Sequence, residues 1–307
     1  DFEIPQFRGN SVQNLALGTT IIEGSEEPAD FSAMDRAIEE ACSNSVQLLM
    51  NYADADDFVL QKTFPSLGGV EIAKKEVRNC SLPVVRGRLT VDTSSLPGDP
   101  MALWDALAQF SAVFLSHSCR VLYDENYCDA EVLHATASAC AHWFGQRRTA
   151  NGTAYDYVVA SKVLAGDGRI TMAQSSLPTN IPHAGNMIRP GYTRNKLYVA
   201  GLDVCQVRKT QEGILLRVTY IVHSDAPGLT SATLGSVVGA EGPLVNTPLG
   251  VLTRIMDLMT AGLCPDKISL SPDTSIALMS LRMNSGKLLS VPEFLYAAIG
   301  TRLGRKS

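Results

Sequence analysis

The sequence predicts an α+β fold in which one antiparallel sheet is accompanied by a long helix near each end of the folded region. Two observations lead to this prediction. Apolar residues recur every three to four positions in long runs near both ends, which is the period of an amphipathic helix. Between these runs, segments with a period of two follow one another across short turns, as the strands of an antiparallel sheet do.

The first expected element is a helix over residues 29–51. Pro28 suits the entry to its first turn. Residues 1–28 show no sustained period and are rich in acidic residues, so we expect an irregular acidic leader there. The apolar positions that define the helix are Phe31, Met34, Ile38, Ala41, Cys42 and Leu49.

About nine strands are expected after this helix. A short helix over 101–110, with Asp99 as its N-cap, interrupts them. A sheet of this many short strands tends to curl, and an apolar helix would fill its concave face. The expected strands are 58–64, 70–77, 84–92, 118–124, 129–137, 153–165, 168–177, 194–208 and 213–224.

The helix expected to fill that face begins at Thr247, with Pro248 in its first turn, and ends at Gly262. The glycine-containing segment 239–250, which spans the start of this helix, is expected to act as a break or hinge. A further short helix is expected from Ser290. The apolar stripe of the long helix consists of Leu249, Leu252, Ile255, Met256 and Met259.

Composition excludes several classes of protein. The formal net charge of −5 argues against a dedicated nucleic-acid binder, and residues 1–60 hold twelve acidic but only two basic side chains. No apolar run reaches the 18 residues of a membrane span. Seven scattered cysteines without a Cys-x-x-Cys pair indicate free thiols in a reducing compartment, which favours a cytoplasmic protein.

No catalytic motif is present. The sequence lacks Gly-x-Ser-x-Gly, His-Glu-x-x-His, a phosphate-binding loop and a dinucleotide-binding glycine motif. His134 and His142 are eight residues apart, which is wide for a metal site. We therefore expect no catalytic residue, no metal and no cofactor.

Several stretches in a fixed order resemble a StAR-related lipid-transfer (START) domain. They are Val84–Gly87, Met101–Leu107, Ala154–Ser161, Asp167–Thr171, Ile188–Gly191 and Val218–Asp225. The resemblance implies a helix-grip fold over residues 29–264, in which a curved sheet wraps the last long helix around one lipid. It also implies that the protein binds a lipid and either transfers it between membranes or senses it, without enzymatic activity. The segment 265–307 would then be a C-terminal extension of unknown role.

The resemblance also implies which residues bind the lipid. Sterol-binding members pair an acidic residue with an arginine inside the tunnel, but the alignment places Ala135 and Ser161 at these positions. Losing both charges together is consistent, because a lone buried charge is costly. A phospholipid or ceramide is therefore expected in preference to a sterol. The expected lining is Tyr157, Val159, Ser161, Met172, Val218, Tyr220, Leu252, Met256 and Met259.

A loop over residues 138–151 is expected at the tunnel mouth. It contains Trp143 and Phe144, followed by Arg147 and Arg148. Aromatic rings suit the headgroup boundary, and basic residues suit an anionic surface. The loop is therefore expected to contact membranes transiently, which makes the protein peripheral to them.

Two other readings remain open. The C-terminal segment 265–307 and the lack of an initiator methionine allow a non-transferring interaction or regulatory module of a larger protein, with other domains or proteins as partners. A hydrolase or cyclase with the same helix-grip fold is the other alternative. It would require an acidic residue or a histidine that points inward.

Overall fold

A computed structural model describes residues 31–80, 82–96, 127–136, 139–146, 154–166, 168–179, 181, 189–209, 213–225 and 243–260. These residues form two α-helices and one sheet of ten strands. The elements are α1 (Phe31–Asp54), β1 (Val59–Phe64), β2 (Val70–Lys75), β3 (Val84–Asp92), β4 (Tyr127–Ala135), β5 (Ala139–Gln146), β6 (Tyr155–Gly166), β7 (Arg169–Ser176), β8 (Thr193–Arg194), β9 (Leu197–Lys209), β10 (Ile214–Ser224) and α5 (Pro243–Thr260).

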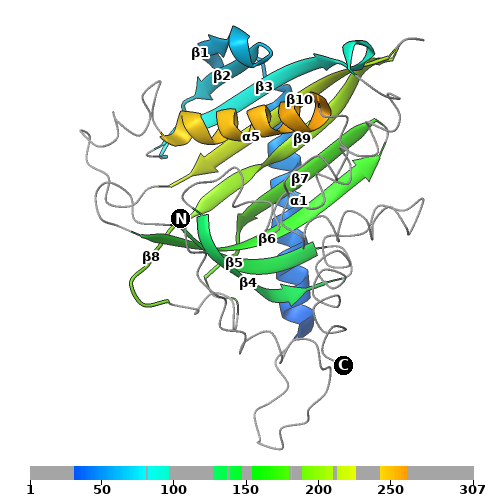
Figure 1. Cartoon of the computed structure of the whole chain (residues 1–307). Helices are drawn as coiled ribbons and strands as arrows, with labels where there is room; N and C mark the ends of the chain where they lie inside the picture. Colours follow the sequence, from blue (N-terminus) through cyan, green and yellow to red (C-terminus); the bar gives the residue numbers. More distant parts are fainter. Residues whose placement is uncertain are drawn as a thin grey trace, which may run out of the picture.

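The strands form one curved sheet in the order β1-β2-β3-β10-β9-β7-β6-β5-β4 (Figure 1). All neighbours along this path are antiparallel, and the short β8 lies parallel to β6 at its side. This confirms the predicted α+β class and the curved antiparallel sheet.

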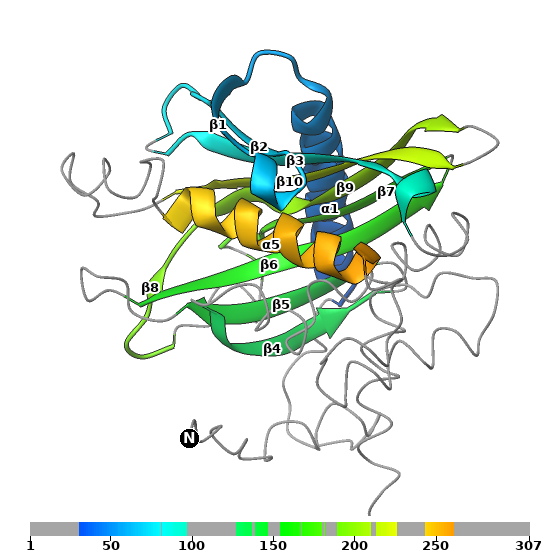
Figure 2. The same cartoon turned by 45° about the horizontal axis from the view of Figure 1, so that its top comes forward.

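The two helices lie on opposite faces of the sheet (Figures 1 and 2). α1 crosses β5, β6, β7, β9 and β10 on one face, whereas α5 lies over β2, β3 and β10 on the other. We call these the α1 face and the α5 face. Because side chains alternate along a strand, each central strand contributes to both faces.

α1 has the predicted apolar stripe. The buried apolar residues of this stripe are three or four positions apart: Met34, Ile38, Cys42, Val46, Leu49 and Ala53. Such a stripe places successive apolar side chains on one side of a helix. Its packing against the strands stabilises the helix more than its intrinsic propensity does.

α5 begins earlier than the sequence indicated. The expected start at Thr247 and Pro248 was wrong, because Pro243 is the first helical residue and Pro248 lies inside the helix. Pro243 fits the first position, where a backbone N–H has no helical partner. The segment 239–250 is therefore not a break from residue 243 onward. Buried side chains of α5 are Pro248, Val251, Leu252 and Ile255.

Other differences concern the strands. β5 and β8 were not predicted, and the expected loop over 138–151 was wrong for residues 139–146. The expected strand over 118–124 lies outside the described residues, as do the helices at 101–110 and from Ser290. The same holds for the segments 1–28 and 265–307. Among the described residues, no helix is long and apolar enough to span a membrane.

Candidate functional site

The residues expected to bind a lipid point to the α5 face. Tyr220 lies directly opposite Gly87 on β3, and Gly87 is in close contact with α5. Leu202 and then Met172 continue the same row across β9 and β7. The structure therefore brings these residues onto one surface, as the alternating strand pattern implied.

Leu252 and Met256 lie on the sheet-facing side of α5, over β2 and β3. A Cβ atom built on Gly87 would lie 2.8 Å from Leu252 Cδ1 and 2.9 Å from Pro248 Cβ. A glycine is thus needed for this close approach of helix and sheet. Met256 lies near Gly68, at the turn between β1 and β2. The side chain of Met259 lies outside the described residues.

A row of uncharged polar side chains crosses the α5 face. Cys140, Ser161 and Gln174 are direct neighbours on β5, β6 and β7, and all three are buried. Cys140 Sγ lies 3.1 Å from Ser161 Oγ and 3.9 Å from His142 Nδ1. Gln174 Oε1 has no hydrogen-bond partner among the described residues. We call Cys140, Ser161 and Gln174 the polar trio.

The same row continues with small apolar residues and then reaches a lysine on β2. Ala200, Val222 and Val85 follow Gln174 across β9, β10 and β3, and Lys74 on β2 lies next to Val85. Burial lowers the pKa of Lys74 from its usual value. In β5, β6 and β7, by contrast, no residue on the α5 face is an acid, a lysine or an arginine.

Aromatic rings flank the polar trio on the β4 side. Phe144 and Tyr157 stack with ring centres 4.7 Å apart, and Tyr127 lies 5.9 Å from Phe144. Asn195 Nδ2 donates a hydrogen bond of 2.7 Å to the Tyr157 hydroxyl. Val159 belongs to the same buried cluster. Aromatic rings therefore gather at this part of the face, whereas the row next to α5 has Tyr220 as its aromatic residue among Leu202 and Met172.

The register changes the sequence-based account of the sterol pair. Ser161 lies where the alignment places the family's arginine, but its direct neighbour is Cys140 rather than Ala135. Ala135 is the next residue in the row, on β4 beyond Cys140. None of these three residues is charged, and the loss of the family's ion pair stays a prediction.

The proposed membrane loop requires a correction. Trp143 and Phe144 are each 1% exposed and lie in β5, so they cannot meet lipid headgroups in this structure. Trp143 points to the α1 face, where its Nε1 donates a hydrogen bond of 2.7 Å to Asp156, and Phe144 points to the α5 face. Arg147 and Arg148 lie outside the described residues.

Cys140 and Gln174 were not singled out from the sequence. Cys140 was missed because β5 is buried on both faces, and its sequence Ala-Cys-Ala-His-Trp-Phe-Gly therefore lacks the polar-apolar alternation of a half-exposed strand. Gln174 lies in an expected strand, where a polar residue at an inward position was the available signal.

The chemistry of the polar trio is that of hydrogen bonding. Burial raises the pKa of the Cys140 thiol to about 11, so it stays protonated at neutral pH and is a poor nucleophile. Among the described residues, no three His, Cys, Asp or Glu side chains gather as ligands of a metal ion. The arrangement can therefore hold an uncharged polar group within an apolar surface.

No protein-family model and no curated protein matches the sequence. Solved structures do match. Human StAR-related lipid transfer protein 5 is 16% identical, with 74% of this chain and 96% of that chain covered and a TM-score of 0.52. Human STARD10 is 14% identical, covering 81% and 92% with a TM-score of 0.48. A STAR-related lipid transfer protein from Xanthomonas axonopodis is 21% identical, covering 66% and 99% with a TM-score of 0.45. The described chain thus has a START-like helix-grip fold, as the sequence resemblance implied.

Proposed function

We propose that the protein binds one acyl lipid between the sheet and α5, with the polar group of the lipid at the polar trio. The observation that carries this proposal is the burial of Cys140, Ser161 and Gln174 on a face that has no charged side chain in β5, β6 or β7. A buried polar group is retained where it is hydrogen-bonded. The likeness of fold to proteins described as lipid-transfer proteins supports the same conclusion.

The ligand is a ceramide-like lipid in preference to a sterol or a phosphodiester. Gln174 Oε1 accepts hydrogen bonds and has no donor among the described residues. A ceramide supplies both hydroxyl and amide donors, a sterol supplies a single hydroxyl, and phosphodiester oxygens only accept. The acyl chains lie along the row of large apolar side chains that includes Met172, Leu202 and Tyr220. Each buried CH₂ group contributes about 0.8 kcal/mol.

The protein carries or senses this lipid without a chemical step. A hydrolase is the alternative that a specific contact favours, because Cys140 Sγ lies 3.9 Å from His142 Nδ1. The raised pKa of the thiol argues against it, since a nucleophilic cysteine needs a thiolate. Exchange requires α5 to move away from β2, β3 and β10 during transient contact with a cytoplasmic membrane surface.

Native mass spectrometry of the full chain tests the proposal. The purified protein, offered ceramide, phosphatidylcholine and cholesterol in separate samples, should gain the mass of one ceramide most readily. Gln174→Leu should weaken ceramide binding about tenfold, the equivalent of one hydrogen bond. Gln47→Leu, at an exposed glutamine of α1, is the matched control and should bind normally.

Two results would contradict the proposal. A chain that gains no lipid mass in any sample would indicate an interaction module instead. Cholesterol binding as tight as ceramide binding would show that the polar trio does not select the ligand.

A further inference from the structure

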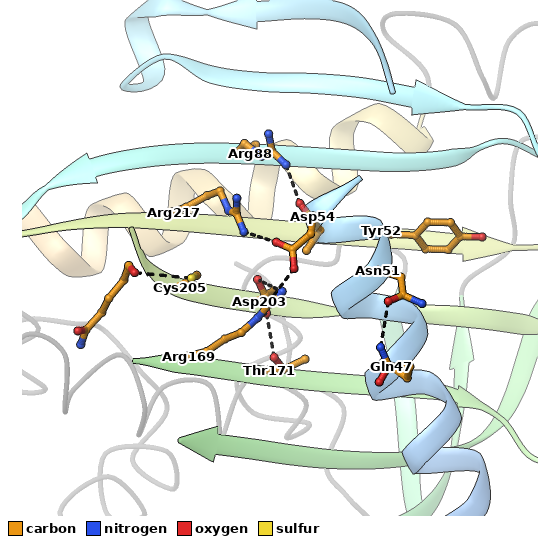
Figure 3. A network of polar contacts seen from close by, with 12 residues as sticks. Gln47, Asn51, Tyr52, Asp54, Arg88, Arg169, Thr171, Asp203, Cys205 and Arg217 are labelled. Carbon is orange, nitrogen blue, oxygen red and sulfur yellow. Dashed lines mark hydrogen bonds and ion pairs between the residues drawn. The ribbon is translucent and has the colours of Figure 1, made fainter. Parts of the chain in front are cut away.

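The α1 face has its own polar region, at the C-terminal end of α1. Arg86 Nη1 donates hydrogen bonds to the backbone oxygens of Tyr52 at 3.2 Å and Ala55 at 2.6 Å. Arg88 Nη2 donates to the backbone oxygen of Ala53 at 2.6 Å (Figure 3). The last carbonyl groups of a helix lack partners within it, so these guanidinium groups supply partners to two of them, those of Tyr52 and Ala53.

Two further arginines in this region bind carboxylates. Arg169 bridges Asp203 and Asp54, with Nε 2.7 Å from Asp203 Oδ1 and Nη1 2.8 Å from Asp54 Oδ2. Arg217 binds the same Asp54, and Thr171 donates to Asp203 (Figure 3). Asp203 is fully buried, whereas the Asp54 side chain is 48% exposed. Arg217 contacts only Asp54 of these two carboxylates. Solvent therefore screens the charge interaction of Arg217 with its partner.

Three buried polar atoms at this place have no hydrogen-bond partner among the described residues. They are Nε of Arg88, Nε of Arg217 and Oγ1 of Thr219. Thr219 lies directly opposite Arg88 on the β3–β10 pair, and Arg217 precedes Thr219 by two residues on the same face. All three atoms can donate a hydrogen bond, and a buried donor without an acceptor is costly. Their residues occupy neighbouring positions on one face of the β3–β10 pair, which points to an acceptor that the described chain does not supply.

The local charge favours an anion over a water molecule as this acceptor. Burial, together with repulsion from Arg88 and Arg217, holds the pKa of Arg86 at about 10, and burial with repulsion from Arg217 lowers that of Arg88. Asp203 lies directly opposite Thr219 on β9, but its carboxylate already accepts hydrogen bonds from Arg169 and Thr171. Asp56 and Glu71 are exposed. A water molecule would bring two hydrogens that need acceptors of their own, whereas an anion accepts from all three donors and offsets the positive charge.

We propose that a small inorganic anion of the size of chloride binds between β3 and β10, with Nε of Arg88, Nε of Arg217 and Oγ1 of Thr219 as its donors. The ion stabilises the packing of the C-terminal end of α1 on the sheet, because Arg88 and Arg217 also bind Ala53 and Asp54 there. The site lies on the face opposite the polar trio and does not depend on the proposed lipid function.

Thermal denaturation of the full chain at constant ionic strength tests the site. The melting temperature should be about 2–5 °C higher in sodium chloride than in sodium gluconate, whose anion is too large to be enclosed. Thr219→Val keeps the side-chain volume but removes one donor, so it should reduce this difference by at least about half. Thr171→Val is the matched control: its hydroxyl already binds Asp203, and the difference should persist even if the melting temperature falls.

Crystals soaked in sodium bromide give a direct measurement. An anomalous peak among Arg88, Arg217 and Thr219 is expected. Equal melting temperatures in the two salts without such a peak would overturn the proposal. A chloride effect that Thr219→Val leaves unchanged would also overturn it, because the ion would then bind elsewhere.

Discussion

His223 is a buried histidine of β10. Its imidazole lies between Tyr198 of β9 and Tyr52 in the last turn of α1. Its ring stacks on Tyr198 at 4.5 Å and meets the edge of Tyr52 at 6.2 Å, and neither nitrogen has a hydrogen-bond partner among the described residues. Burial lowers its pKa from 6.5 to about 4, although Asp225 acts in the opposite direction. The folded protein therefore disfavours the protonated ring.

This imidazole should make stability depend on pH. Between pH 6.5 and 4 the unfolded chain binds the proton more readily, so the contribution of His223 is complete above 6.5 and is lost as the pH falls to about 4. The loss should approach about 3 kcal/mol. Urea denaturation at several pH values should give a shallower dependence for His223→Phe, which keeps the ring stack. Identical slopes for the two proteins would refute this assignment, since all other titrating groups are shared.

Gly87 sets how closely α5 approaches the sheet. A methyl group there would meet the rigid ring of Pro248 at 2.9 Å and Leu252 at 2.8 Å, so Gly87→Ala should lower the free energy of unfolding by about 1–3 kcal/mol. Gly166→Ala is the control, because nothing lies within 4 Å of its Cβ position. It should change stability by less than about 0.5 kcal/mol. Equal effects of the two variants in urea denaturation would show that α5 does not press on β3.

At the scale of elements, strands with one solvent-facing side could be predicted closely. The observed β3 has the predicted bounds of 84–92, because its buried and exposed positions differ in polarity toward its end. β5 could not be predicted in this way, since seven of its eight residues are buried and both faces are apolar or weakly polar. Its place between β4 and β6 comes from long-range pairing, which local patterns do not record.

The same limit applies to the candidate site. The alternation of β6 placed Tyr157, Val159 and Ser161 on one face from the sequence alone. Which strand lies beside Ser161 depends on tertiary register, so Cys140 could not be identified. The start of α5 was misplaced because Pro243 and Pro248 both suit a first turn. The structure places Pro248 inside the helix, where it packs against Gly87 of β3, and this tertiary contact leaves no local signal in the sequence.

β5 should behave as a core strand when its tryptophan is removed. Trp143→Ala deletes a fully buried ring beneath α1 and should cost about 3–5 kcal/mol of unfolding free energy. Trp143→Phe should cost less, because Asp156 keeps two hydrogen bonds from Arg194 at 2.8 and 3.0 Å. Urea denaturation followed by circular dichroism measures both. A stable Trp143→Ala protein with weakened vesicle binding would instead restore the membrane-loop interpretation.

For the whole molecule, the two faces of the sheet have different chemistry. The α1 face holds ion pairs and guanidinium groups that fix α1, including contacts of Asp35 with His134 and Glu39 with Lys162. The α5 face has uncharged side chains in β5–β7. α1 is thus bound through charge and packing, whereas the described contacts of α5 with β3 are apolar, through Pro248 and Leu252 at Gly87. This asymmetry supports the proposal that α5, rather than α1, is the element that would move if a lipid is exchanged.

The topology also predicts the order of folding. β6–β7 and β9–β10 are hairpins, whereas β3 pairs with β10 across a long stretch of chain, for example Asp92 with Leu215 and Val85 with Val222. Closing so long a loop costs entropy before any contact is gained, so β3 should join after the hairpins, on a timescale of about milliseconds to seconds. Pulsed hydrogen exchange during refolding should therefore protect amides of β6 and β7 before those of β3. Protection of β3 together with, or ahead of, the hairpins would show that the β3–β10 pair forms in the initial step instead.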